Sequence, residues 1–329
     1  MNKKLIAAAI VAAVVAAPAA FADSVVYGRA HVSVDMNDEE SFGDKDNYEV
    51  NSRSSRLGFK GSEDLGNGLK AIYQFEFGID VDDNAGINGG RNTFVGLAGD
   101  WGTFLVGKHD TPQKVAFYAA GNERLGDSIV DLNLRNCDFS RQGSAPIGVF
   151  HECRADNAIA YVSPSFGGFS VAGAVVPGEA TDGDSADLND AYSVGAMFSS
   201  NGLRASVGYT DYNDLPGATD VDVLQVGASM TMNAFSIGAQ YETSDLDGTD
   251  YDAWAVTGKF TFGNNAVSVL YTDSDMEDTY DTSGWGLAAE HNFSKRTKVY
   301  AAYASAEQDN EGGSSTDDDV FSLGMIHDF

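Results

Sequence analysis

The sequence is poor in the features that mark helical membrane proteins, nucleic-acid-binding proteins and disulfide-rich domains. Its 329 residues include two cysteines and six prolines, and 20 Lys and Arg stand against 49 Asp and Glu. A chain this acidic is a poor partner for nucleic acid. Beyond residue 22, no apolar run approaches the roughly 18 residues that a membrane-spanning helix needs.

Catalytic signatures are missing as well. The sequence has no G-x-S-x-G elbow, no Walker-type phosphate loop and no dinucleotide-binding fingerprint. The segment "HECR", residues 151–154, places three metal-ligating residue types side by side, but no second His or Cys pair follows at ligand spacing. We therefore expect neither an enzyme nor a resident cofactor.

The N-terminus has the features of a cleaved secretory signal. A basic start, "MNKK", precedes the apolar run "LIAAAIVAAVVAA" and the A-x-A motif Ala20-Phe21-Ala22. The run is too short to cross ~30 Å of hydrocarbon as an anchor helix. We expect residues 1–22 to be removed and residues 23–329 to be exported. Because Lys3 and Lys4 leave with the signal, the mature net charge is 18 minus 49, or −31.

The mature chain is rich in short segments in which apolar and polar residues alternate, the period of β-strands rather than helices. The 37 Gly, 14 Tyr and 19 Phe suit strands and turns. We predict sixteen strands, near residues 24–34, 51–61, 69–77, 91–99, 102–109, 156–163, 168–176, 191–199, 202–210, 222–231, 234–242, 252–262, 265–272, 283–292, 297–304 and 319–329.

The connections between these segments alternate between short and long. The short ones, such as "GDW", "SNG" and "FGNN", have the composition of tight turns. The long ones are residues 35–50, 78–90, 110–155, 177–190, 211–221, 243–251, 273–282 and 305–318, and all but seven of the 49 acidic residues lie in or beside them. Short turns on one side and long acidic loops on the other are typical of outer-membrane barrels.

The two faces of the strands differ in polarity. On the first strand Val26, Val32 and Val34 share one side, whereas Arg29 and His31 share the other. Apolar residues facing outward and polar residues facing inward reverse the pattern of a packed β-core. The sequence therefore predicts an all-β fold, a 16-stranded antiparallel transmembrane β-barrel with a wet interior.

Several stretches resemble the general porins of Gram-negative outer membranes. They run from "VVYGRAHVSV" through "SRLGFKGSEDLGNGLKAIYQFEFG", "RNTFVGLAGDWGTFLVGKHDTP" and "DNAIAYVSPSFGGFSVAGAV" to the terminal "SLGMIHDF". This resemblance implies a homotrimer in the outer membrane that lets small hydrophilic solutes and ions diffuse passively. It also implies that the third long loop, residues 110–155, folds back into the barrel and constricts it.

In that family, basic residues of the wall face acidic residues of the loop across the opening. Carried over residue by residue, the wall would be Arg29, Arg56, Lys60, Arg91, Lys108 and Arg154. The loop acids would be Glu123, Asp127 and Asp131, whose spacing of four would put them on one helical face. The family's usual loop-tip sequence is absent, and the alternative is that all these charges only solubilise the surface.

Both cysteines, Cys137 and Cys153, fall in the third loop. In an oxidising periplasm a disulfide between them would close a loop of a size that gains ~3 kcal/mol. The alternative is a pair of free thiols, since porins of this type mostly lack cysteine.

The acidic loops suggest an anionic outer surface in contact with lipopolysaccharide, where divalent cations bind loosely. The net charge of −31 favours a mild preference for cations. Two alternatives stay open, a substrate-preferring or loop-binding barrel with little free conductance, and an outer-membrane hydrolase, which lacks a Ser-His constellation.

The chain ends on Phe329, in the alternating stretch "DVFSLGMIHDF". We expect this last strand to pair with the first and close the barrel, with Leu323, Met325, His327 and Phe329 facing outward. By resemblance, the terminal Phe is also the signal that the barrel-assembly machinery reads.

Overall fold

The computed structural model describes residues 23–39, 45–82, 86–135, 145–178, 187–212 and 220–329. The predicted signal peptide, residues 1–22, and Cys137 lie outside these ranges. Within them, no helix is both long and apolar enough to span a membrane.

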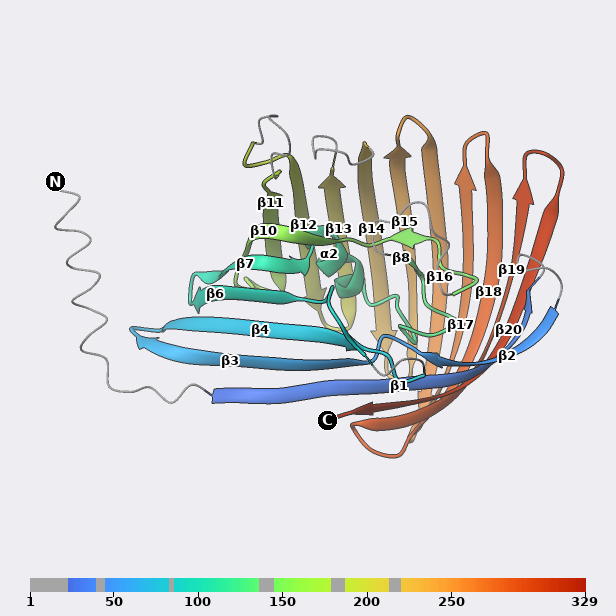
Figure 1. Cartoon of the computed structure of the whole chain (residues 1–329), viewed down its shortest axis with the longest axis horizontal. Helices are drawn as coiled ribbons and strands as arrows, with labels where there is room; N and C mark the ends of the chain where they lie inside the picture. Colours follow the sequence, from blue (N-terminus) through green and yellow to red (C-terminus); the bar gives the residue numbers. More distant parts are fainter. Residues whose placement is uncertain (1–22, 40–44, 83–85, 136–144, 179–186, 213–219) are drawn as a thin grey trace.

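Almost the whole described chain is β-structure (Figure 1). The first strands are β1 (Asp23–Glu39), β2 (Lys45–Ser52), β3 (Arg56–Gly66), β4 (Leu69–Ile79), β5 (Ile87–Asn88), β6 (Thr93–Gly99) and β7 (Gly102–Asp110). The third loop contains α2 (Pro112–Ala120), β8 (Asn133–Arg135) and β9 (Phe150–His151). There follow β10 (Arg154–Val162), β11 (Phe169–Val176), β12 (Ala191–Ser200), β13 (Leu203–Asp211), β14 (Val221–Met232), β15 (Phe235–Leu246), β16 (Asp250–Phe262), β17 (Asn265–Met276), β18 (Tyr280–Asn292), β19 (Thr297–Asn310) and β20 (Ser315–Asp328).

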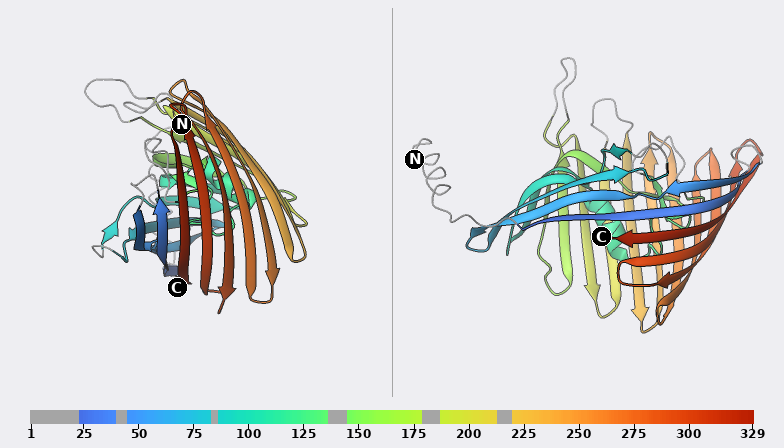
Figure 2. Two further views of the ribbon diagram at one scale, coloured as in Figure 1. Left: turned by 90° about the vertical axis from the view of Figure 1, so that its right-hand side faces the viewer. Right: turned by 60° about the horizontal axis from the view of Figure 1, so that its bottom comes forward.

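The strands form one closed antiparallel sheet of sixteen spans. Each neighbour in sequence is a neighbour in space, and β20 returns to pair with β1. The sheet has eighteen labelled strands, but β2 and β3 both pair with β1, and β5 and β6 both pair with β4, so each of these pairs is one interrupted span. The two further views show the continuous curved wall (Figure 2). The predicted fold and all sixteen strands are confirmed.

Several strands extend further toward the long loops than the sequence predicts. β15 continues to Leu246, β17 to Met276 and β19 to Asn310, so the predicted loops 243–251, 273–282 and 305–318 are largely strand. The backbone ladder continues beyond the hydrophobic alternation, because each added pair satisfies further N–H and C=O groups.

The interior is only partly wet, and this corrects the prediction. Side chains of the third loop, among them Phe117, Ile129 and Phe150, form an apolar core with residues on the inner face of β14 to β20, such as Val223 and Leu270. These strands carry apolar residues inward because the loop covers them. In Figure 1 the loop lies inside the sheet, and α2 packs against β12, β13 and β14.

Candidate functional site

The third loop enters the lumen through a short capped helix. Thr111 precedes α2 with extended backbone and its side chain accepts a hydrogen bond from the N–H of Lys114 (3.2 Å), while Pro112 occupies the first turn. Gly121, with φ 72°, ends the helix in the left-handed conformation. A Cβ on Gly195 of the wall would lie 2.5 Å from the carbonyl oxygen of Pro112, so the missing side chain lets the helix approach.

The helix predicted around the loop acids does not form. α2 ends at Ala120, and residues 121–132 make irregular turns in which Asp127 has a φ of 60°. Glu123, Asp127 and Asp131 therefore do not share a helical face. They come together because the turns fold on themselves: the carboxylate of Asp131 accepts hydrogen bonds from the N–H groups of Asp127 (2.5 Å) and Asn133 (2.9 Å).

A cavity of about 360 Å³ lies between this loop and the wall, where its lining residues come from β1, β3, β7, β10, β19 and β20. Seven of its lining side chains are basic and three are acidic. The basic residues are Arg29, Arg56, Arg91, Lys114, Arg124, Arg154 and Lys298; the acidic ones are Asp110, Glu123 and Asp127. Four of the six predicted wall cations and two of the three predicted loop acids are thus brought together.

Most of the wall arginines have carboxylate partners of their own. Arg29 forms two hydrogen bonds with Asp328 (2.7 and 3.2 Å), and Nε of Arg91 lies 2.6 Å from Glu76. These partners hold the guanidinium groups in fixed positions along the wall.

Two further arginines pair with carboxylates at the base of the loop or within it. Arg154 is 2.7 Å from Asp110, where the loop leaves β7. Arg56 reaches Asp127 of the loop at only 3.5 Å, so this ion pair spans the cavity more loosely than the others.

The two predicted lysines do not line the cavity. Lys60 lies with its ammonium nitrogen 4.7 Å from the ring centroid of Tyr27, and Lys108 forms an ion pair with Asp156 at 2.6 Å. The Tyr27 hydroxyl in turn donates to Glu76 (2.9 Å), the partner of Arg91.

The loop carboxyls differ in their environment. Burial and the neighbouring Asp131 raise the pKa of Glu123 well above its usual range. Burial also raises the pKa of Asp131 to about 6 and that of Glu152 to about 8, although the nearby Lys114 lowers the latter. The side chain of Asp127 is 28% exposed and faces Arg56. Of the three predicted loop acids, Asp127 is therefore the one that presents an exposed charge to the cavity.

The sequence analysis did not predict three of the basic residues that line the cavity: Lys114, Arg124 and Lys298. Nor did it predict that Arg124 contacts the wall. Arg124 donates to the hydroxyls of Thr257 (2.9 Å) and Ser236 (3.0 Å). Lys298 binds Glu290 at 2.8 Å. The signal for Lys298 was its place in the alternation, two residues before the buried Tyr300.

Among the described residues, no group of three His, Cys, Asp or Glu side chains is placed to hold a metal ion, and the "HECR" segment forms none. Cys153 is fully buried and disulfide-bonded. Cys137 lies outside the described residues, so its pairing with Cys153 stays a prediction.

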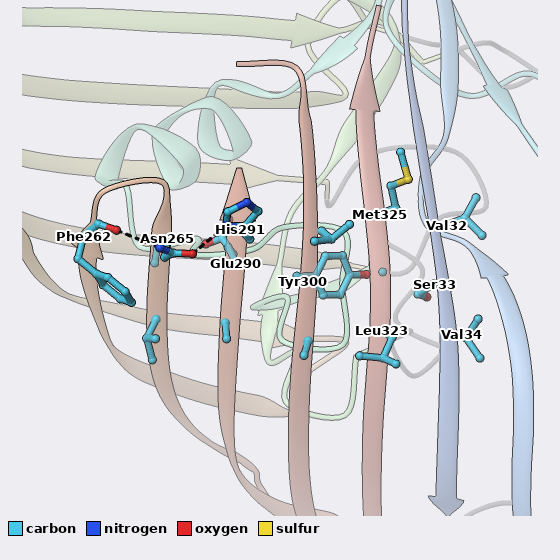
Figure 3. Close-up of a pocket in the computed structure, with 16 residues that line it drawn as sticks. Val32, Ser33, Val34, Phe262, Asn265, Glu290, His291, Tyr300, Leu323 and Met325 are labelled. Carbon is cyan, nitrogen blue, oxygen red and sulfur yellow. Dashed lines mark hydrogen bonds between the residues drawn. The ribbon is translucent and has the colours of Figure 1, made fainter. Parts of the chain in front are cut away.

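A second hollow, of about 690 Å³, lies on the outer face of the barrel (Figure 3). Its rim is formed by outward-facing apolar side chains, among them Val34, Phe262, Leu323 and Met325, which are each 44 to 50% exposed. The polar contact at one end joins His291 to Asn265 (2.8 Å). Most of its lining is apolar, but the lining also includes Glu290, the partner of Lys298 in the charged cavity of the lumen.

Comparison with known proteins gives consistent results. Residues 7–311 match the family model described as Gram-negative porin. The outer membrane porin protein 32 of Delftia acidovorans is 31% identical, over 92% of this chain and 89% of that protein. The major outer membrane protein P.IB of Neisseria gonorrhoeae is 28% identical, over 91% of this chain and 92% of that protein.

Among solved structures, an anion-selective porin from Comamonas acidovorans shares the fold. It superposes with a TM-score of 0.74 at 22% identity, covering 94% of this chain and all of the other. An outer membrane protein of Vibrio cholerae with a loop deletion superposes with a TM-score of 0.69 at 17% identity, covering 94% of this chain and 99% of the other.

Proposed function

The chain belongs to the family of Gram-negative porins, and from this premise we propose that it forms a water-filled channel through which small hydrophilic solutes and ions diffuse passively. It is an outer-membrane protein, as its relatives are. The observation that supports the proposal is the charged cavity between the third loop and the wall, where Arg56 faces Asp127 inside a closed barrel. Opposed charges at a constriction favour hydrated polar solutes over apolar ones.

We propose that the constriction prefers anions, in place of the cation preference expected from net charge. Basic side chains outnumber acidic ones in the lining by seven to three, and the raised pKa of Glu123 disfavours the charged form of one of these three acids. Carboxylates that pair with the wall arginines, such as Asp328 with Arg29, reduce this excess. At 0.1 M salt, charges beyond about 10 Å are largely screened, so the acidic loops count less than the lining.

We further propose that three copies assemble, as the family resemblance implies, and that the outer surface meets lipid and lipopolysaccharide. Phe329 is proposed as the residue that the barrel-assembly machinery recognises. No catalytic activity is proposed, because the porin family consists of channels.

Reconstitution of the purified protein in planar bilayers tests the proposal. We expect conductance to rise in groups of three equal steps, and the reversal potential in a salt gradient to have the sign of anion preference. The Comamonas protein of the same fold is named as anion-selective.

A folded protein without conductance steps would contradict the channel and favour the alternative, a barrel whose surface loops bind a partner. Steps with a reversal potential of the opposite sign would leave the channel standing and overturn only the proposed selectivity.

A further inference from the structure

The end of the third loop is fixed to the barrel wall at one buried carboxylate. Glu242, on the inner face of β15, is 0% exposed. Its Oε2 accepts a hydrogen bond from the backbone N–H of His151 (2.9 Å), and its Oε1 bonds to Nδ1 of the same residue. One wall side chain thus holds both the backbone and the ring of a loop residue.

The carbonyl oxygen of His151 gathers two further donors. Nε2 of Gln113, on α2, donates to it at 2.8 Å, and Nε2 of Gln225, on β14, at 2.7 Å. Gln225 also donates to Oε2 of Glu242 (2.5 Å). The start of the loop, its end and two wall strands therefore meet at His151.

Apolar side chains surround this contact. The ring of Tyr251 lies edge-on to that of His151, with centroids 4.9 Å apart, and its hydroxyl donates to the carbonyl of Val149 (2.6 Å). Phe150 is fully buried beside them. In such surroundings a hydrogen bond is stronger than in water. A polar group that loses its partner there therefore costs more free energy than it would in water.

The contact lies three residues from the cavity lining. The carbonyl of Cys153 accepts hydrogen bonds from the N–H (3.0 Å) and the hydroxyl (3.1 Å) of Thr111, which joins the two ends of the loop. The next residue, Arg154, forms its ion pair with Asp110 in the lining. A shift of His151 would therefore be transmitted to charges that face the cavity.

We propose that Glu242 is a positioning residue, which holds the constriction loop against the wall and thereby sets the width and the charge of the opening. This inference rests on the proposed channel function. Glu242 itself does not touch the cavity, so it acts through His151 and the loop.

The experiment compares three full-length variants in planar bilayers. Glu242→Ala removes both acceptors, whereas Glu242→Gln keeps the shape and one acceptor oxygen. Thr272→Val is the matched control, since Thr272 is equally buried and, among the described residues, its hydroxyl has no hydrogen-bond partner. Resistance of the folded form to SDS at room temperature shows whether each barrel has formed.

We expect Glu242→Ala to form a barrel whose conductance fluctuates between levels and whose reversal potential moves toward zero. Loss of the Glu242 carboxylate, the buried hydrogen-bond partner of His151, should raise the fraction of channels whose third loop is displaced from the wall by about tenfold or more. Glu242→Gln, which keeps one of the two acceptor oxygens, should fluctuate less than Glu242→Ala but more than the native protein, and Thr272→Val should match the native protein.

Native-like conductance and selectivity in a folded Glu242→Ala channel would overturn the inference while leaving the channel intact. A native protein that does not conduct would instead refute the proposed function itself. If Glu242→Ala fails to fold, Glu242→Gln decides: unstable conductance in the folded amide variant supports the inference, and a native trace contradicts it.

Discussion

At the scale of single residues, Glu123, Asp127 and Asp131 of the constriction loop make different contacts. Glu123 is half-buried, accepts a hydrogen bond from the N–H of Leu132 (3.2 Å) and has a raised pKa. Asp131 is buried and caps turns of the loop through two backbone N–H groups. Asp127 alone among them faces Arg56 across the cavity. Sequence spacing treats the three alike, and their hydrogen bonds and ion pairs separate them.

Two isosteric substitutions separate these roles. Asp127→Asn removes an ionised carboxylate from the cavity, so the reversal potential should shift toward stronger anion preference. Glu123→Gln should change the reversal potential less than Asp127→Asn does, because the raised pKa of Glu123 disfavours its ionised form. Measurement in a tenfold salt gradient checks both, and an equal shift in the two variants would contradict this difference.

The buried carboxyl of Glu152 makes the docking of the loop depend on pH. Its hydroxyl partner Tyr118 lies 2.7 Å away, and its pKa is raised from 4.5 to about 8, chiefly by burial. A group whose pKa is raised on folding stabilises the folded state fully below its unfolded value and loses that contribution as pH rises through the folded value. Stability should therefore fall between about pH 4.5 and 8.

Glu152→Gln should flatten this part of the profile, and the native protein should lose on the order of a few kcal/mol relative to the variant across that window. Urea unfolding followed by tryptophan fluorescence at several pH values measures the difference. Parallel profiles for the two proteins would show that Glu152 does not carry the effect, since Asp131 and Glu123 contribute with the same sign in both.

At the scale of elements, the membrane wall is predictable and the loop inside it is not. Alternation is a local property, so the strands from β10 to β20 could be placed within a few residues from the sequence. The site was partly accessible, because Arg29 and Arg56 lie in the inward phase of β1 and β3, and Arg91 lies just before β6. Their partners Asp328 and Glu76 were not, because ion pairs depend on register and on closure.

The fold of the third loop depends on contacts that are distant in sequence. Phe117 and Ile129 pack against wall residues more than 90 positions away, such as Val221. A signal for this packing did exist: the inward phase of the later strands is apolar at Val223, Ala253 and other positions, which a water-filled lumen does not require. Helical spacing within the loop was a weaker guide than these missing polar residues.

The seam between β1 and β20 closes around the last residue. The backbones of Gly28 and Phe329 exchange two hydrogen bonds of 3.1 Å. A Cβ on Gly28 would lie 2.4 Å from the ring of Phe329 and 2.6 Å from the carbonyl oxygen of Arg56. The terminal ring therefore lies over a position where only glycine leaves room.

Gly28→Val should reduce the yield of inserted barrels, because the valine side chain would clash with the ring of Phe329 and with the backbone carbonyl of Arg56. Deletion of Phe329 should have the same effect while leaving the conductance of the channels that do insert unchanged. Gly173→Ala is the control, since a Cβ at that strand glycine meets nothing within 4 Å. The amount of heat-modifiable protein in isolated outer membranes measures insertion; normal yields for Gly28→Val would contradict the role of the seam.

At the scale of the whole molecule, acidic residues are aligned across neighbouring strands. Asp211, Asp222, Asp245 and Asp250 are successive partners from β13 to β16, and Asp252, Asp275, Asp281 and Asp309 are successive partners from β16 to β19. Like charges directly opposite each other destabilise a sheet. These two acidic rows therefore need screening by salt.

Stability should rise with ionic strength, and Mg²⁺ should act at lower concentration than Na⁺, in line with the proposed loose binding of divalent cations. The double variant Asp245→Asn, Asp281→Asn should be more stable than the native protein at low salt and nearly equal to it at 1 M NaCl, where the Debye length falls to about 3 Å. Unfolding midpoints in urea at stepped salt concentrations provide the measurement. An unchanged salt dependence in the double variant would contradict the role of the rows.

The apolar docking of the third loop has a consequence for engineering. Sixteen strands determine the circumference of the shell, but the packed side of the lumen removes part of that cross-section from transport. The width of the open lumen and the circumference of the barrel can therefore be changed separately. The loop and the inward-facing wall residues that it packs against could be replaced together, which would change the solutes that pass through the channel. The lipid-facing side chains would stay the same.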